Sequence, residues 1–172
     1  MSNTSRQHHE RIIYPNHRRA IVAGYGVVGR MVTLELERHG MSVTVIDLNL
    51  NTIEKQLGLN KNVVYGPVQD PDTLKRAGID QADVLALTIP VEADAVEACR
   101  VARGLNPDIF IAARANFVSQ GMLCSQAGAD CVIVEEIVTA QAMRQAITEK
   151  LEHRGGLPVP VRRTADTACA NR

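Results

Sequence analysis

The sequence predicts an α/β fold in which a doubly wound parallel sheet of six strands is covered by helices. Three observations carry this prediction. Six short apolar runs alternate with segments of helical period. Runs such as "VTVI" and "VLAL" are apolar on both faces, as strands buried between two helical layers must be. Three closely spaced glycines also join the first run to the first helical segment, as the ligand-binding turn of such a sheet requires.

The strands are expected where β-branched and other apolar residues cluster between turn residues. These segments are Arg19–Ala23, Ser42–Ile46, Asn62–Tyr65, Ala82–Thr88, Asp108–Ala113 and Cys131–Val134. Because helices separate them, the connections are right-handed crossovers and the strands run parallel.

The helices are expected where apolar residues recur at helical spacing and end near glycine or basic residues. They are Val27–His39, Leu50–Leu57, Asp72–Ala77, Glu92–Gly104, Phe117–Gln126 and a C-terminal crossing helix at Glu136–His153. The chain therefore divides into a flexible N-terminal segment (1–17), a nucleotide-binding domain (18–135), an interface helix (136–153) and a disordered tail (154–172).

Composition excludes several classes of partner. Lys plus Arg equals Asp plus Glu, aromatic residues make up 3% and Trp is absent, so the chain lacks both the basic patch and the stacking platform of a nucleic-acid-binding protein. No apolar stretch is long enough for direct membrane insertion. The four cysteines form no C-x-x-C pair, which favours a reduced, cytoplasmic setting.

The stretch "IVAGYGVVGR" is the clearest chemical signal in the chain. Gly24 would permit a tight turn, Gly26 a close approach of the backbone to a pyrophosphate, and Gly29 close packing of the helix on the strand. The helix N-terminus would then face the phosphates, as in Rossmann-like folds. Arg30 either reaches a phosphate or belongs to a solvated helix face.

Asp47 ends the second predicted strand, eighteen residues after Gly29. A carboxylate at this place can accept hydrogen bonds from both ribose hydroxyls of an adenosine and repel a 2′-phosphate. NAD(H), or an adenine nucleotide, is therefore expected rather than NADP. The alternative role of Asp47 is to cap the turn that follows the strand.

The sequence favours a binding module over an enzyme. The predicted nucleotide fold uses the chain up to Val134 and leaves 38 residues, too few for a substrate domain. None of the common catalytic motifs is present. The alternatives are an NAD-dependent oxidoreductase subunit acting with a separate chain, and an interaction protein with a vestigial glycine loop.

From about Arg18 to Met143 the chain resembles the N-terminal lobe of the domains that regulate conductance of potassium (RCK), also called the TrkA-N or KTN domain. The resemblance rests on "IVAGYGVVGR", "VTVID", "YGPVQDPDTLKRAGIDQADVLALT", "NPDIFIAARA" and "AGADCVIVEEIVTAQAM" in this order. It implies a cytoplasmic, non-catalytic domain or subunit that binds NAD(H), AMP, ADP or ATP. Its implied partner is a membrane-embedded potassium channel, uptake system or efflux antiporter, which would hold it at the inner face of the membrane.

The resemblance also extends the set of expected site residues. The family usually has Gly-Asp-Ala-Thr or Gly-Asn-Ala after the third strand, where this chain has Gly66-Pro67-Val68-Gln69. ATP-sensing relatives often carry Arg where this chain has Val27, which argues against triphosphate sensing. The full expected nucleotide-binding set is Gly24, Tyr25, Gly26, Val27, Val28, Gly29, Arg30, Asp47, Leu48, Gly66, Pro67, Val68, Thr88 and Arg114; Arg114 has a structural ion pair as its alternative role.

Such lobes pair as dimers, so a homodimer or higher oligomer is expected. The helix at 136–153 would cross to the neighbour through Ile137, Ala140, Met143 and Ile147, although packing within the chain would produce the same stripe. Glu136 matches a glutamate that in some relatives lies near a phosphate or cation between subunits; its place at a helix N-terminus is the alternative explanation. No resident metal site is expected.

Overall fold

A computed structural model describes residues 18–153, and within them six strands form one sheet in the order β3-β2-β1-β4-β5-β6. Every neighbouring pair in the sheet is parallel. The strands are β1 (Arg19–Ala23), β2 (Ser42–Asp47), β3 (Asn62–Tyr65), β4 (Val84–Leu87), β5 (Phe110–Ala115) and β6 (Cys131–Val134). The predicted doubly wound Rossmann-like fold is thereby confirmed.

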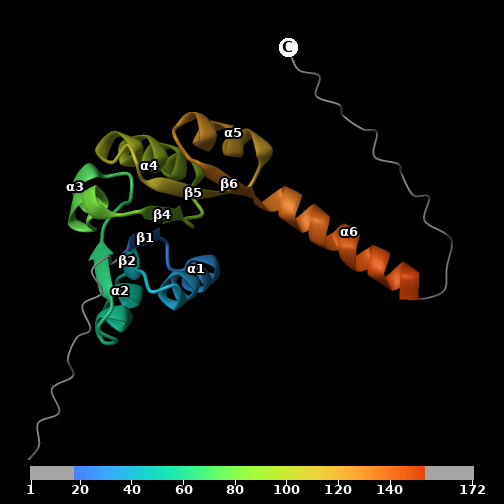
Figure 1. Ribbon diagram of the computed structural model, residues 1–172, viewed down its shortest axis with the longest axis horizontal. Coiled ribbons are helices and arrows are strands. Elements are labelled where there is room, and N and C mark those ends of the chain that lie inside the picture. The colour runs from blue at the N-terminus through green and yellow to red at the C-terminus, as the bar shows by residue number, and fades with distance from the viewer. Residues whose placement is uncertain (1–17, 154–172) are drawn as a thin grey trace, which may run out of the picture. The chain divides into compact units, whose positions relative to one another are not determined.

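A helix follows each strand, and the helices before α6 cover both faces of the sheet (Figure 1). Their bounds are α1 (Val27–Arg38), α2 (Leu50–Leu57), α3 (Pro71–Arg76), α4 (Glu92–Leu105), α5 (Val118–Gln126) and α6 (Glu135–His153), with a short 3₁₀ turn η1 at Ile79–Gln81. Each of the six α-helices lies within two residues of its predicted bounds, whereas η1 was not predicted.

Two strands begin later than the apolar runs predict, and local turns explain both shifts. β4 starts only at Val84 because η1 occupies Ile79–Gln81 and Ala82 is the C-cap residue of that turn. β5 starts at Phe110 because Asn106 closes a turn, its side-chain oxygen accepting the Asp108 N–H at 3.1 Å. Asparagine side chains often replace a backbone partner in this way.

The core divides into the two apolar layers that a doubly wound sheet requires. On one face, Ile21, Ile46 and Leu85 belong to a buried cluster with Leu74 of α3 and Cys99 of α4. On the other face, strand residues pack against apolar side chains of α1; this second cluster includes Ala20, Val22, Val43, Val45, Ala86, Val32 and Leu36. The strands are thus buried on both sides, which explains the unbroken apolar runs in the sequence.

Side-chain caps fix where several helices begin. Asn49 accepts the Asn51 N–H at 3.0 Å at the start of α2. Asp70 accepts the N–H groups of Asp72 and Thr73 at the start of α3, where Pro71 opens the helix. The hydrogen bond from the Thr73 hydroxyl is the largest cause that lowers the pKa of the Asp70 carboxyl. These caps satisfy amide donors that have no partner inside the helix.

The described part of the chain separates into two compact units, the first ending at Glu136 and the second starting at Ile137. Among the described residues the second unit consists of α6 from Ile137 onward, and its apolar residues Ile137, Met143, Ile147 and Leu151 are exposed. Within residues 18–153 no helix combines the length and hydropathy needed to cross a bilayer. The expected flexible ends at 1–17 and 154–172 lie outside the described residues.

Candidate nucleotide-binding site

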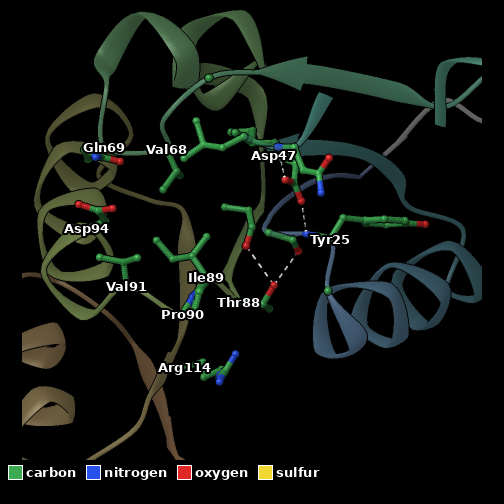
Figure 2. A pocket seen from close by; sticks show the side chains of 17 residues that line it. Tyr25, Asp47, Val68, Gln69, Thr88, Ile89, Pro90, Val91, Asp94 and Arg114 are labelled. Atoms are coloured by element: carbon green, nitrogen blue, oxygen red, sulfur yellow. Dashed lines mark hydrogen bonds between the residues drawn. The ribbon is translucent and has the colours of Figure 1, made fainter. Parts of the chain in front are cut away.

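A cleft of about 500 Å³ opens at the carboxyl ends of β1, β2, β4 and β5. β1 lies between β2 and β4, so the cleft sits where the chain reverses its direction of progress through the sheet. Open parallel sheets bind ligands at this place because the loops diverge there. Figure 2 shows the side chains that surround the cleft.

Each glycine of the loop meets a different steric demand. Gly24 has φ +88°, and its N–H donates to the Ile46 carbonyl at 2.8 Å. A Cβ on Gly29 would lie 1.9 Å from the Gly24 carbonyl oxygen, so α1 can approach the loop only with glycine there. A Cβ on Gly26 would meet nothing within 4 Å, although Gly26 lines the cleft. The space beside Gly26 is therefore open to a ligand.

The first turn of α1 presents backbone donors beside this space. Gly26 is its N-cap residue and supplies no capping side chain. Arg30 lies along its own helix, its Nε donating to the Gly26 carbonyl at 3.3 Å, and does not line the cleft. Free amide donors and the positive end of the helix dipole favour an anion at such a position.

Asp47 fastens the glycine loop to the end of β2. Its Oδ2 accepts the Tyr25 N–H at 2.7 Å, and its Oδ1 accepts the Asn49 N–H at 2.7 Å. An ionised carboxylate offers about four acceptor positions, so two remain for a ligand. The capping role and the ribose-binding role of Asp47 are therefore compatible.

Thr88 and Arg114 line the cleft and are both engaged within the protein. The Thr88 hydroxyl lies 3.0 Å from the Ala23 carbonyl oxygen and 2.8 Å from that of Gly24, which braces the loop from β4. The Arg114 guanidinium forms an ion pair with Glu135, the first residue of α6. The structural ion pair foreseen for Arg114 thus exists alongside its place in the cleft.

The remaining wall carries the expected Val68 together with residues outside the expected set. Val68 is buried in the turn after β3, and Gln69, which was not expected, follows it. Asp94 in the first turn of α4 lies on the same side of the cleft (Figure 2). Ile89, Pro90 and Val91 extend this wall after β4, while Ala23, Ile46 and Asn49 complete the lining. Their place after strand ends was a usable signal, but no sequence period fixes side-chain direction in such turns.

Several expected residues lie near the cleft without lining it. Val27 and Val28 are exposed on α1, and Pro67 is exposed on the turn after β3. Gly29 instead lies where α1 packs against the Gly24 carbonyl. Glu136 also lies outside the lining, and its Oε1 accepts the Val118 N–H at 2.9 Å at the start of α5. Gly24, Tyr25, Gly26, Asp47, Leu48, Gly66, Val68, Thr88 and Arg114 do line the cleft.

Thiol and metal chemistry find little support in the described part of the chain. Burial raises the pKa of Cys99 to about 12 and also raises that of Cys124, so neither thiol is an activated nucleophile at neutral pH. Among residues 18–153 no three His, Cys, Asp or Glu side chains gather as metal ligands.

Comparison with known proteins identifies the family. The sequence profile of the TrkA-N domain matches residues 20–135. The chain belongs to the TrkA-N domain family.

Relatives of this TrkA-N domain occur in potassium channels and transporters. Potassium channel protein 1 of Methanocaldococcus jannaschii is 30% identical over 69% of the chain. The putative cation/proton antiporter YbaL of Escherichia coli is 29% identical over 77%. The chain spans 36% of the length of the first protein and 23% of the second, so it corresponds to one part of each.

Solved structures share the fold. The TrkA-N domain of YbaL from Escherichia coli superposes with a TM-score of 0.73 at 27% identity, covering 78% of this chain and 99% of that domain. The Kef C-terminal domain of Shewanella denitrificans, solved in an AMP-bound form, has a TM-score of 0.64 at 24% identity, covering 77% and 81%. The GsuK channel bound to NAD has a TM-score of 0.58 at 22% identity, covering 69% and 21%.

Proposed function

We propose that this TrkA-N domain binds an adenine nucleotide, with NAD(H), AMP and ADP as the leading candidates, and regulates a potassium channel, uptake system or efflux antiporter. The domain itself performs no catalysis. One observation carries the nucleotide-binding part: the Gly24–Gly29 loop is tied through the Tyr25 N–H to the Asp47 carboxylate at the edge of an open cleft. Phosphate and ribose sites thereby become neighbours.

The residues around Asp47 support NAD(H) over NADP(H). A 2′-phosphate on the adenosine ribose would approach the Asp47 carboxylate. The next residues, Leu48, Asn49 and Leu50, offer no cation to receive that phosphate. Arg114 is the cation in the cleft lining, and Glu135 already neutralises it.

The regulatory part of the proposal rests on the family and on Arg114. Relatives of the chain are channel and antiporter proteins, and fold neighbours were solved with AMP and NAD. Arg114 joins the cleft to the first residue of α6. A nucleotide that attracts the guanidinium would compete with Glu135, so binding would alter the start of α6. We place the dimer contact on the exposed apolar residues of α6.

Isothermal titration with NAD, NADH, NADP, AMP, ADP and ATP tests the nucleotide-binding part. We expect saturable binding of at least one adenine nucleotide and weaker binding of NADP than of NAD. Absence of binding to the whole panel would contradict the proposal and favour a vestigial glycine loop. Turnover of NADH with a panel of carbonyl compounds would instead favour an oxidoreductase subunit.

The transport part requires a membrane partner. Co-purification with a potassium channel or antiporter subunit, followed by flux measured in vesicles with and without nucleotide, would test it. We expect the flux to change with nucleotide in the presence of the domain and to stay constant in its absence.

A further inference from the structure

A second cavity, of about 210 Å³, opens at the end of the sheet opposite the nucleotide cleft. It lies at the amino ends of β1, β2 and β3. Four polar side chains belong to its lining: Arg19 of β1, Ser42 and Thr44 of β2, and Asn62 of β3. We call this cavity the amino-end pocket. The proposed nucleotide-binding function uses none of its residues and therefore does not explain its polar lining.

Strand register places these four side chains on one face of the sheet. Arg19 pairs with Ser42, and Thr44 pairs with both Ile21 and Asn62. Paired residues of neighbouring parallel strands share a face, and Ile21 belongs to the first buried apolar cluster. All three strands thus change from apolar to polar on the same face and at the same end. This coincidence gathers the polar groups into one pocket.

Most of the hydrogen-bonding capacity of the pocket is free. The side chains of Ser42, Thr44 and Asn62 make no hydrogen bond with any residue in 18–153. The Arg19 guanidinium donates to Gln81 Oε1 through Nη1, which leaves other N–H groups of its fork available. Polar groups that line a cavity without protein partners are suited to binding a ligand.

Charge favours an anion as that ligand. The lining contains the Arg19 cation and no carboxylate. Asp83, which precedes β4, lies outside the lining, and its Oδ2 accepts the Arg19 backbone N–H at 2.7 Å. Guanidinium, hydroxyl and amide groups are the usual protein donors to the oxygens of phosphate.

Size restricts the anion to a small one. The volume of the pocket falls below the range of about 300 to 1,000 Å³ that is typical for drug-sized ligands. Ser42 and Thr44 are two residues apart on one strand, a separation of about 6.6 Å. A single tetrahedral ion can accept hydrogen bonds from both hydroxyls across that distance, whereas a nucleotide exceeds the pocket.

We propose that the amino-end pocket binds a small tetrahedral oxyanion such as phosphate or sulfate. Arg19 supplies the positive charge, and Ser42, Thr44 and Asn62 supply neutral donors. The inference is independent of nucleotide binding, because no residue lines both cavities. A bound ion would join β1, β2 and β3 where their shared face lacks apolar packing, and would stabilise the folded state by mass action.

An NMR titration of the isotope-labelled chain with sodium phosphate tests the site, with sodium chloride holding the ionic strength constant. We expect saturable shifts of the backbone amides of Arg19, Ser42 and Asn62. Phosphate can also bind at the start of α1, so the amide of Gly26 reports separately on that position. Sulfate should shift the same amides of the amino-end pocket. Shifts confined to the glycine loop, or shifts that never saturate, would overturn the proposal.

Two variants remove single donors. Arg19→Gln is expected to raise the dissociation constant for phosphate about tenfold or more, because it removes the charge. Thr44→Val keeps the shape of the side chain without its hydroxyl and is expected to raise that constant about threefold to tenfold. Arg38→Gln is the matched control, because Arg38 is an exposed arginine of α1 outside the lining. It should bind phosphate like the wild type.

The spectrum of each variant also shows whether the chain is folded. If Arg19→Gln fails to fold, Thr44→Val still tests the pocket at a neutral position. Wild-type affinity in the folded cleft-independent variants Arg19→Gln and Thr44→Val would overturn the proposal. An equal loss of affinity in Arg38→Gln would overturn it too, since it would indicate general attraction by surface charge.

Discussion

Asp47 serves the protein and the proposed ligand at the same time. Its two oxygens already hold the N–H groups of Tyr25 and Asn49. Replacing it therefore removes both an acceptor for the ribose hydroxyls and a brace of the glycine loop. Its contribution to binding should exceed that of a residue with ligand contacts alone.

We expect Asp47→Ala to weaken NAD binding by about 2 to 3 kcal/mol, or roughly 30-fold to 150-fold, as titration calorimetry would measure. Asp47→Asn separates the two roles. Its side-chain oxygen can still accept the Tyr25 N–H, while the capacity to accept both ribose hydroxyls falls. Unchanged affinity in both variants would remove Asp47 from the ribose site.

The glycines of the loop should separate folding from binding. Gly26→Val is expected to abolish nucleotide binding and leave the far-UV circular dichroism and melting temperature near wild type, because its Cβ would enter open space in the cleft. Gly29→Ala should instead lower the free energy of unfolding by about 2 to 3 kcal/mol or more, because its Cβ would lie 1.9 Å from the Gly24 carbonyl oxygen. Loss of fold in Gly26→Val would contradict this division.

Asp130 gives the fold a dependence on pH. Its Oδ2 accepts the Ile111 N–H at 2.7 Å and the Arg103 guanidinium at 2.7 Å. The backbone hydrogen bond from Ile111 is the largest cause that lowers the pKa of this carboxyl. A lowered pKa in the folded state means that the stabilisation is complete above the unfolded pKa of about 3.9 and is lost as pH falls through the folded value.

The corresponding variant is Asp130→Asn. At pH 7 we expect it to lower the free energy of unfolding by about 1 kcal/mol, measured by urea denaturation. The difference from wild type should shrink as pH falls below about 4, where the carboxyl of the unfolded chain takes up a proton, and should vanish once pH is below the lowered pKa of the folded state. A difference that stays constant from pH 7 to pH 3 would show that the charge of Asp130 contributes nothing.

At the scale of elements, sequence pattern predicted the strands and helices closely and the side-chain partners poorly. Apolar β-branched runs located all six strands because these strands are buried on both faces. The pair between Arg114 and Glu135 joins the end of β5 to the start of α6, and no periodicity links such positions. The directions of Pro67, Val68 and Gln69 within one irregular turn were equally inaccessible.

Glycine and carboxylate positions in the site were predictable for a different reason. The turn between β1 and α1 needs a positive φ at Gly24 and no Cβ at Gly29, so sterics restrict these positions to glycine. The contribution of α4 depends instead on how its first turn meets the turn after β3, which is a property of tertiary packing. Asp94 therefore carried no sequence signal of its own.

The link between the cleft and α6 can be tested through Glu135. In Glu135→Gln the Arg114 guanidinium loses its anionic partner, so its charge is free to attract a phosphate. We expect AMP and ADP to bind about threefold more tightly, since half-exposed ion pairs contribute less than about 1 kcal/mol. Titration calorimetry on the intact chain measures this directly.

Glu136→Gln is the matched control for that experiment. This neighbouring carboxylate accepts the Val118 N–H and does not line the cleft, so nucleotide affinity should stay at the wild-type value. If Glu136→Gln alters binding and Glu135→Gln does not, the predicted contact of Glu136 with a phosphate or cation would be favoured over the competition at Arg114.

At the scale of the whole molecule, the open question is what covers the apolar residues of α6. Ile137, Met143, Ile147 and Leu151 fall on one side of this helix, and their exposed fractions range from 43% to 61%. With Ala140 between the first two, successive members are three or four residues apart. An exposed apolar stripe of this length indicates an interaction surface. A second copy of the chain offers the same stripe, so a symmetric helix pair would bury both.

We therefore predict a homodimer that depends on one face of α6. Ile147→Glu places a charge in the stripe, and a symmetric dimer contains two copies of the change. The dimer should weaken by about 3 kcal/mol or more, at least a hundredfold in dissociation constant. Val138→Glu is the matched control: Val138 is a similarly exposed aliphatic residue nine positions earlier, half a turn away on the opposite face. Light scattering over a range of concentrations should show a dimer for the wild type and for Val138→Glu, and a monomer for Ile147→Glu. A monomeric wild type, or equal dissociation in both variants, would contradict the assignment of this stripe as the subunit contact.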